Sequence, residues 1–187
     1  MKAISLWQPH GLAICLGLKP WETRNWPTSY RGPLAIHAAK RVWSDKGLWH
    51  DMAVRTLRRK LFPSVGDTET GASFCLIAPW VIYGAVLCVV DVVDCVRTSS
   101  LRGRIPRDHE FWGDFSDGDT GKGRYAWKLE NLRVLPKALN WRGQQGFFEV
   151  DLGGAWEAPA ASMTMDLFGS NDMASSLTPS IFDGQRR

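Results

Sequence analysis

The chain has 187 residues, of which 44% are hydrophobic and 22% are charged, so its size and composition are those of one compact domain with an extension. This composition excludes a globally disordered chain, a collagen-like protein and a coiled coil. No uncharged apolar run reaches the roughly 18 residues of a membrane helix, and the residues before Gln8 are too few for a secretory signal. We therefore expect a cytoplasmic protein that does not bind membranes.

The net charge of +4 is unevenly distributed along the chain. Residues 1–70 carry 11 Lys and Arg against 5 Asp and Glu, whereas residues 71–187 carry 12 against 14. Five of the ten tryptophans also lie in the basic part. Positive charge interleaved with flat rings suits an anionic ligand that carries bases. The alternative interpretation is that the rings form the core and the charges a solvated face.

The first 75 residues show patterns of both strands and helices. Pro9 suits the first turn of a helix, and Gly17 suits the position just after its end. Apolar residues recur every four positions between Trp49 and Leu61, which predicts a longer helix that begins at Ser44. In chain order, we predict a strand at 3–7, a helix at 9–16, strands at 19–27 and 34–39, a helix at 44–61 and a loop at 64–73.

The second part of the chain predicts mainly strands. Valine enrichment makes residues 81–96 the strongest strand signal. Residues 99–124 are rich in charged and turn-forming residues, which predicts a long surface loop. Further strands are predicted at 125–129, 132–135 and 146–150, with Glu130 and Asn131 separating the first two.

Short strands dominate, and strands and helices do not alternate regularly. Five to seven strands with two or three helices indicate an α+β domain, and we expect a small, partly open β-barrel over residues 1–152. From Gly153 onward Ala, Ser, Thr, Met and Pro dominate and no periodic pattern continues. We therefore predict that residues 153–187 form a disordered tail.

Common catalytic and cofactor motifs are absent from the sequence. It contains no G-x-S-x-G elbow, no P-loop, no dinucleotide-binding glycine motif and no H-E-x-x-H. The four cysteines have no C-x-x-C spacing, so we expect free, buried thiols rather than a zinc or redox site. The acidic segment 114–119 lacks the terminal glutamate of a calcium loop. We therefore predict neither a metal nor an organic cofactor.

The segment 17–24 (GLKPWETR) is the best candidate for a functional site. Lys19, Glu22 and Arg24 lie where a short helix leads into a strand, and alternation places Glu22 and Arg24 on one strand face. Lys and Arg can hold a phosphate or a carbonyl oxygen. A neighbouring carboxylate can orient them, accept an N–H group or act as a base. The alternative is a surface ion pair, which contributes little.

The same segment resembles the G-x-K-x-x-E-x-R signature of the ASCH family, a branch of the PUA-like superfamily. The flanking segments ISLWQP (4–9), YRGPLAIHAAK (30–40), YAWKLE (125–130) and WRGQQGFF (141–148) are similar as well. The resemblance covers about residues 2–151 and omits the tail. It implies a small PUA-like β-barrel in which the signature lines a basic cleft.

The resemblance also implies an association with RNA or with modified nucleosides. Some ASCH-like proteins are ribonucleases, and a smaller branch consists of amidohydrolases that deacylate N4-acyl cytidine. In that branch a lysine is followed three positions later by a threonine, with a glutamate further on. Lys19 matches the lysine, but Glu22 stands at the threonine position, and Thr23 comes one step later on the opposite strand face. Asp91 or Asp94 would stand for the later acid.

Five more residues complete the predicted site. Asp91 lies inside a valine-rich strand and is costly to bury without a partner, so we expect it to turn into the cleft. His37 would be a proton shuttle if it opens to the cleft, or otherwise a packing residue. Trp7 and Trp26 could stack on a base. The predicted catalytic residues are Lys19, Glu22, His37 and Asp91, and the predicted ligand-binding residues are Lys19, Glu22, Arg24, Trp7, Trp26 and Lys40.

Three hypotheses follow for the function. The first is an ASCH domain that binds single-stranded RNA or a modified nucleoside in a basic, tryptophan-lined cleft. The second is a metal-independent hydrolase that acts on RNA or on N4-acylated cytidine in the same cleft. The third is an adaptor that uses its tail. There Thr164–Phe168 (TMDLF) resembles a short peptide with which bacterial proteins engage the replication sliding clamp, and we expect a weak contact of this kind.

Overall fold

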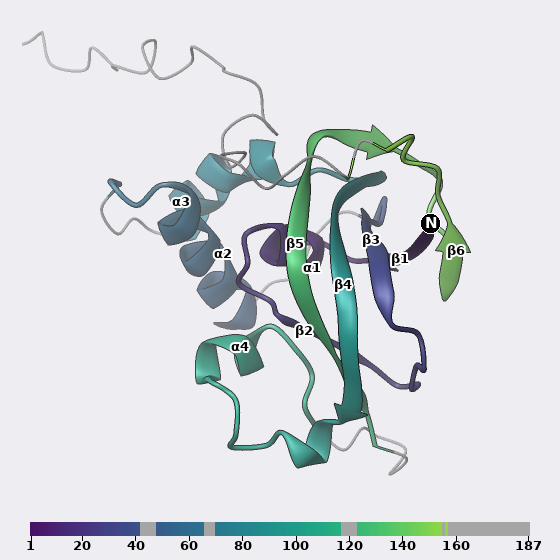
Figure 1. Ribbon diagram of the computed structural model, residues 1–187. Helices are drawn as coiled ribbons and strands as arrows, with labels where there is room; N and C mark the ends of the chain where they lie inside the picture. The colour runs from purple at the N-terminus through teal and green to yellow at the C-terminus, as the bar shows by residue number, and fades with distance from the viewer. Residues whose placement is uncertain (42–47, 66–69, 117–122, 155, 157–187) are drawn as a thin grey trace, which may run out of the picture.

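The computed structural model describes residues 1–41, 48–65, 70–116, 123–154 and 156 (Figure 1). Six strands form one mixed sheet in the order β2-β5-β4-β3-β1-β6. β1 and β3 are parallel, and the other neighbouring strands are antiparallel. The strands are β1 (Lys2–Leu6), β2 (Trp21–Arg24), β3 (Gly32–Ala38), β4 (Ala85–Arg97), β5 (Tyr125–Asn140) and β6 (Phe147–Glu149). Among the described residues the edge strands β2 and β6 do not pair with each other. The curved sheet therefore stays open, as expected of a partly open barrel.

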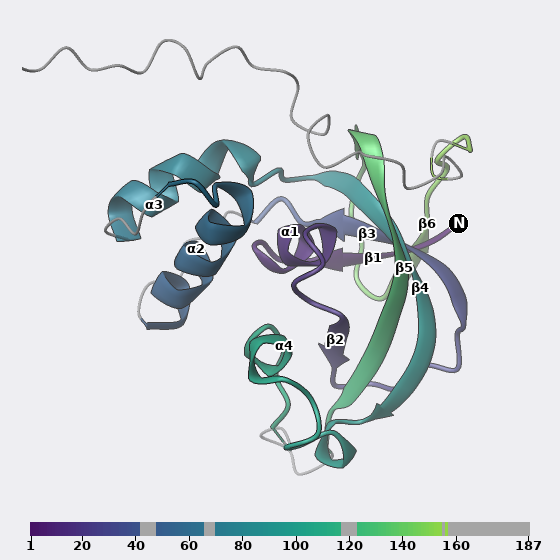
Figure 2. The ribbon, with the colours of Figure 1, turned by 60° about the vertical axis from the view of Figure 1, so that its left-hand side comes forward.

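In the described part of the chain, four α-helices lie to one side of the sheet (Figure 2). The helices are α1 (His10–Cys15), α2 (Leu48–Leu61), α3 (Thr70–Ile77) and α4 (Arg107–Phe111), and 3-10 turns lie at Ala78–Trp80 and Thr98–Ser100. Helix α1 lies between the sheet and the α2–α3 pair. Its Leu12 and Ala13 pack into a cluster with α2, whereas Ile14 and Cys15 pack against the sheet. This small helix therefore joins two parts of the core.

The valine-rich run of β4 is buried because apolar groups cover both faces of this central strand. Leu87 and Val90 belong to the cluster that contains α1, while Val86 and Val89 belong to a second cluster with Phe148. A strand covered on both faces has a continuous apolar sequence rather than an alternating one. This explains why the segment gave the strongest strand signal.

The structure corrects three predictions of secondary structure. Part of the loop expected at 64–73 belongs to α3, which begins at Thr70. Strand β5 is continuous from Tyr125 to Asn140, and Asn131 adopts a φ of 50° inside it rather than ending a strand. Asparagine tolerates this left-handed conformation, and the pairing of β4 with β5 shifts register in this region. Residues 81–83 precede β4 instead of belonging to it.

Residues 99–124 are more than a surface loop. They contain α4, and Trp112 is almost completely buried beside Trp49 and Phe111. Phe115 is buried too. These few apolar side chains anchor the segment to the rest of the domain although turn-forming residues surround them in the sequence.

Most of the predicted tail, 153–187, lies outside the described residues, and so do Ser44 and Thr164–Phe168. Within its described part, the Trp156 ring packs beside the second sheet cluster, with the Arg133 guanidinium 5.3 Å from the ring centre. All four cysteines are free, but only Cys15 and Cys88 are buried as predicted, whereas Cys75 is exposed and Cys95 is half-buried. None of the described helices combines the length and the apolar character that crossing a bilayer requires.

Candidate ligand-binding cavity

The end of α1 directs Lys19 toward β2. Gly17, with a φ of 71°, donates its N–H to the carbonyl of Ile14, and Leu18 donates its N–H to the carbonyl of Ala13. These two bonds form a Schellman motif, in which glycine supplies the left-handed residue that ends a helix. The chain reverses there, so Lys19 enters the interior just before β2 begins.

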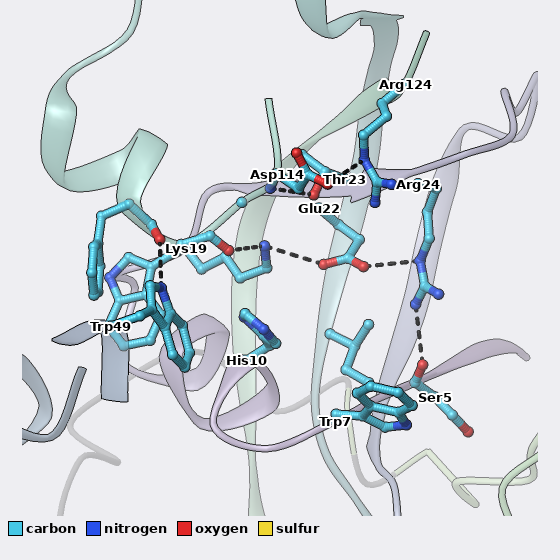
Figure 3. A pocket seen from close by; sticks show the side chains of 14 residues that line it. Ser5, Trp7, His10, Lys19, Glu22, Thr23, Arg24, Trp49, Asp114 and Arg124 are labelled. Atoms are coloured by element: carbon cyan, nitrogen blue, oxygen red, sulfur yellow. Dashed lines mark hydrogen bonds and ion pairs between the residues drawn. The ribbon is translucent and has the colours of Figure 1, made fainter. Parts of the chain in front are cut away.

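Lys19, Glu22 and Arg24 form one connected group of charges (Figure 3). Glu22 Oε2 lies 3.3 Å from Lys19 Nζ, and Glu22 Oε1 lies 2.9 Å from Arg24 Nε, an ion-pair distance at which the Nε–H does not point at the oxygen. Arg24 Nη2 also donates to the Ser5 carbonyl at 3.1 Å, and Lys19 Nζ donates to the Trp112 carbonyl. The side chains of Lys19 and Glu22 are only 2% and 8% exposed. The group is therefore an interior ion pair that a partly exposed arginine extends.

Burial and the neighbouring charges together determine the protonation states of Lys19 and Glu22. Burial lowers the pKa of Lys19 below the ordinary 10.5 even though Glu22 opposes the shift. Burial alone would raise the pKa of Glu22, but the charges of Lys19, Arg24 and His10 outweigh it and hold that pKa below 4.5. Glu22 is therefore ionised at neutral pH, and Lys19 releases its proton more readily than an exposed lysine.

A cavity of about 500 Å³ opens beside the charged group. Its aromatic walls are Trp7, His10, Trp49, Phe111 and Trp112, and its charged residues are Lys19, Glu22, Arg24, Asp114 and Arg124. In Figure 3 the Lys19–Glu22–Arg24 group crosses the cavity, with His10 and Trp7 on one side of it and Thr23, Asp114 and Arg124 on the other. We call this space the first cavity. Its size is typical of small-molecule sites.

Several residues of the first cavity were not predicted from the sequence. Thr23 was expected on the opposite strand face, yet it lines the same cavity, and its hydroxyl accepts the Asp114 N–H at 2.9 Å. Asp114 forms an ion pair with Arg124 at 3.2 Å. A Cβ atom at Gly113 would lie 3.0 Å from Thr23 Cγ2, so glycine lets this segment approach β2 closely. The glycine next to Trp112 was the signal available in the sequence.

Four predicted site residues lie outside the first cavity, and two of these, Trp26 and Asp91, line neither of the two spaces around Trp7. Trp26 is partly buried and packs against the core, edge-on to Trp127 with ring centres 4.6 Å apart. Asp91 does not turn toward Lys19. It forms an ion pair with Arg133 at 2.5 Å and accepts a hydrogen bond from Asn131, which satisfies the carboxylate locally.

His37 and Lys40 line a separate hollow, together with Trp7. His37 Nε2 lies 3.1 Å from the Trp141 carbonyl and Nδ1 lies 3.0 Å from Ser5 Oγ. Because a carbonyl only accepts, Nε2 carries the proton and Nδ1 accepts from the hydroxyl. Burial lowers the pKa of His37, which favours this neutral form. Of the predicted residues, the first cavity thus collects Trp7, Lys19, Glu22 and Arg24.

Within the described part of the chain, no three His, Cys, Asp or Glu side chains gather into a cluster that could hold a metal ion. What the first cavity offers is a pair of cationic donors, an ionised acceptor and several aromatic faces. This combination can bind a flat heterocycle that carries both donor and acceptor groups.

Comparison with known proteins agrees with the signature around Lys19. The model of the ASCH domain matches residues 4–135. A crystal structure of ASCH from Zymomonas mobilis is 15% identical, with 81% of this chain and 88% of that chain covered and a TM-score of 0.47. A search of curated proteins gave no significant match. Since the family match spans well over half of the sequence, the chain belongs to the ASCH domain family.

Proposed function

We propose that this ASCH domain binds single-stranded RNA or a modified nucleoside and holds a base in the first cavity. The family is generally RNA-binding. The observation that carries the proposal is the buried Lys19–Glu22–Arg24 group beside an aromatic-lined cavity. A buried ion pair is weak evidence for a stabilising role, because desolvation can cancel its attraction. A role in recognition accounts better for charges held at this depth.

The two kinds of wall have separate tasks in base binding. Lys19 and Arg24 can donate to a carbonyl oxygen of the base, and Glu22 can accept from an exocyclic amine. Trp7 is 59% exposed, and Arg41 lies 4.1 Å from its ring centre. An exposed, flat ring beside a cavity is suited to stacking, which contributes about 1–3 kcal/mol per base. An inorganic anion alone would need only the cations.

Hydrolysis of the bound ligand is the second candidate, and two observations favour it. Burial lowers the pKa of Lys19, so its amine loses its proton more easily than that of an exposed lysine and can then act as a base. Thr23 also lines the first cavity, so lysine, threonine and glutamate surround the same space. A metal-independent hydrolase would use these groups on RNA or on N4-acylated cytidine.

A single set of incubations separates binding from hydrolysis. The protein is mixed in EDTA with labelled single-stranded RNA and, separately, with N4-acetylcytidine, and both affinity and product are measured. Saturable, salt-sensitive binding of an intact ligand supports a reader, whereas product formed by the wild type and lost in Lys19→Ala supports an enzyme.

Suitable controls keep this test independent of folding. Trp7→Ala changes an exposed residue and should weaken binding without lowering the melting temperature. Lys60→Ala removes an exposed lysine that lines neither this cavity nor the hollow beside His37, and it should behave as the wild type. Wild-type affinity in both Lys19→Ala and Trp7→Ala would show that the first cavity is not the binding site.

A further inference from the structure

A second hollow, of about 960 Å³, lies next to the first cavity. It is formed where β3 ends, where β4 begins and where the chain leaves β5 toward β6. His37, Lys40, Tyr83, Trp141 and Arg142 are among its lining residues. We call this space the second hollow. Neither the residues of the signature nor the proposed base site accounts for it.

The floor of the second hollow is held in place by close contacts. His37 is 1% exposed, and its two ring nitrogens are fixed by Ser5 and by the carbonyl of Trp141. A Cβ atom at Gly143 would lie 2.4 Å from His37 Cε1 and 2.6 Å from Ser5 Oγ. The segment 141–145 therefore packs directly against β1 and β3, and only glycine fits at this contact.

The chemistry of the second hollow suits a negatively charged ligand. Lys40 and Arg142 supply two exposed cations, and no Asp or Glu is present among the described residues that line it. The rings of Tyr83 and Trp141 add flat apolar surface, and Asn140, Gln144 and Gln145 add neutral amides. Cations, amides and rings without a carboxylate are suited to a phosphate with its attached sugar and base.

Ser5 and Trp7 connect the two spaces, because both residues line each of them. The Ser5 carbonyl accepts from Arg24 at 3.1 Å in the first cavity, and its hydroxyl lies 3.0 Å from His37 Nδ1 in the second hollow. Figure 3 shows Trp7 and Ser5 at the edge of the Lys19–Glu22–Arg24 group. A ligand that leaves the first cavity past Trp7 therefore reaches Lys40 and Arg142.

We propose that the second hollow is a subsite for the neighbouring nucleotide, so that the ligand is a single strand of RNA crossing Trp7 rather than a free nucleoside. This inference rests on the proposed function, since it needs a base in the first cavity. The phosphate between the two nucleotides faces both Lys40 and Arg142, and the second base lies against the rings of Tyr83 or Trp141. The second hollow thereby sets the minimum length of the ligand.

Ligand length provides the test. The probes are a labelled, mixed-sequence RNA hexamer and the four unphosphorylated nucleosides, titrated into the wild type, Lys40→Ala, Arg142→Ala and the control Arg104→Ala. Arg104 is exposed and lines neither space. We expect each subsite variant to bind the hexamer about 5–10-fold more weakly, and the salt slope to fall by about 0.7 for one lost single-strand phosphate contact. Affinities for the nucleosides, which carry no phosphate, should not change.

The outcomes distinguish the subsite from the base site. Equal hexamer affinities in Arg142→Ala, Lys40→Ala and Arg104→Ala would overturn the subsite and leave base binding in the first cavity intact. An equal loss of hexamer and nucleoside binding in Arg142→Ala would also overturn it, because the residue would then not act on the neighbouring nucleotide. Failure of the wild type to bind either probe would overturn the proposed function together with this inference. Unchanged melting temperatures in all variants exclude misfolding.

Discussion

Glu22 determines the charge balance of the first cavity, because each of its carboxylate oxygens faces a different cation. The spacing of the signature and the alternation along β2 predicted that Glu22 and Arg24 share a face, and the structure brings them together with Lys19. The sequence could not predict the Trp112 carbonyl that accepts from Lys19, since the two residues are 93 positions apart. Contacts of that kind depend on tertiary packing rather than on local pattern.

Removing one member of the buried group should be costly, and removing two should cost less. In Glu22→Gln the Lys19 ammonium remains buried without its counter-charge, so we expect the free energy of unfolding to fall by about 3–5 kcal/mol. In the double variant Lys19→Met/Glu22→Gln that buried charge is gone, and part of the stability should return. Urea unfolding of the wild type, both single variants and the double variant measures this coupling. Strictly additive losses would show that the two charges do not stabilise each other.

His37 should make the protein less stable as the solution is acidified. Because burial holds the pKa of His37 below 6.5 in the folded state, the unfolded chain takes up a proton first as the pH falls. The stability contribution of the neutral ring is complete above pH 6.5 and decreases as the pH falls toward the lowered pKa. In His37→Gln the free energy of unfolding should be lower at pH 7 but should decrease less between pH 7 and pH 5. Parallel pH profiles of variant and wild type would contradict this assignment.

At the scale of secondary structure, periodic segments were predictable and irregular ones were not. The strand before Gln8, the helix that follows Pro9 and the valine-rich strand β4 follow from periodicity and terminal residues. Helix α4 and the buried Trp112 lie in a segment dominated by turn formers, where composition indicates a loop. The second hollow is built in part from the connection after β5. Its position depends on the continuity of β5, which the sequence signal at Glu130 and Asn131 obscured.

The connection between β5 and β6 should tolerate a substitution of Gln145 but not one of Gly143. Gly143→Ala would place a Cβ atom 2.4 Å from His37 Cε1, so we expect a loss of about 1–3 kcal/mol from overpacking. Gln145→Ala changes an exposed residue of the same segment and should stay within about 0.5 kcal/mol of the wild type. Thermal and urea unfolding compare the two. If Gly143→Ala were as stable as Gln145→Ala, the close packing of this segment against β3 would not require the absence of a Cβ atom at position 143.

At the scale of the whole molecule, the cations that line the two spaces come from both the basic and the acidic part of the chain. Residues 1–70, which carry the basic excess, supply Lys19, Arg24 and Lys40 to the lining of the two spaces. Arg124 and Arg142 come from the acidic remainder and join the two spaces only through the fold. Lys19 and Arg24 are largely neutralised by Glu22, so they serve hydrogen bonding more than long-range attraction.

The exposed cations, rather than Lys19 and Arg24, should set the salt dependence of RNA binding. Lys40, Arg41 and Arg142 are exposed, and none of them has an ion-pair partner among the residues that the structure describes. If about three cations meet phosphates, the slope of log K against log salt for the RNA hexamer should be about −2, since a single strand contributes about −0.7 per contact. Fluorescence anisotropy at a series of salt concentrations measures the slope. A slope near zero would assign recognition to neutral contacts, and a slope steeper than about −4 would require a longer basic path than these two spaces provide.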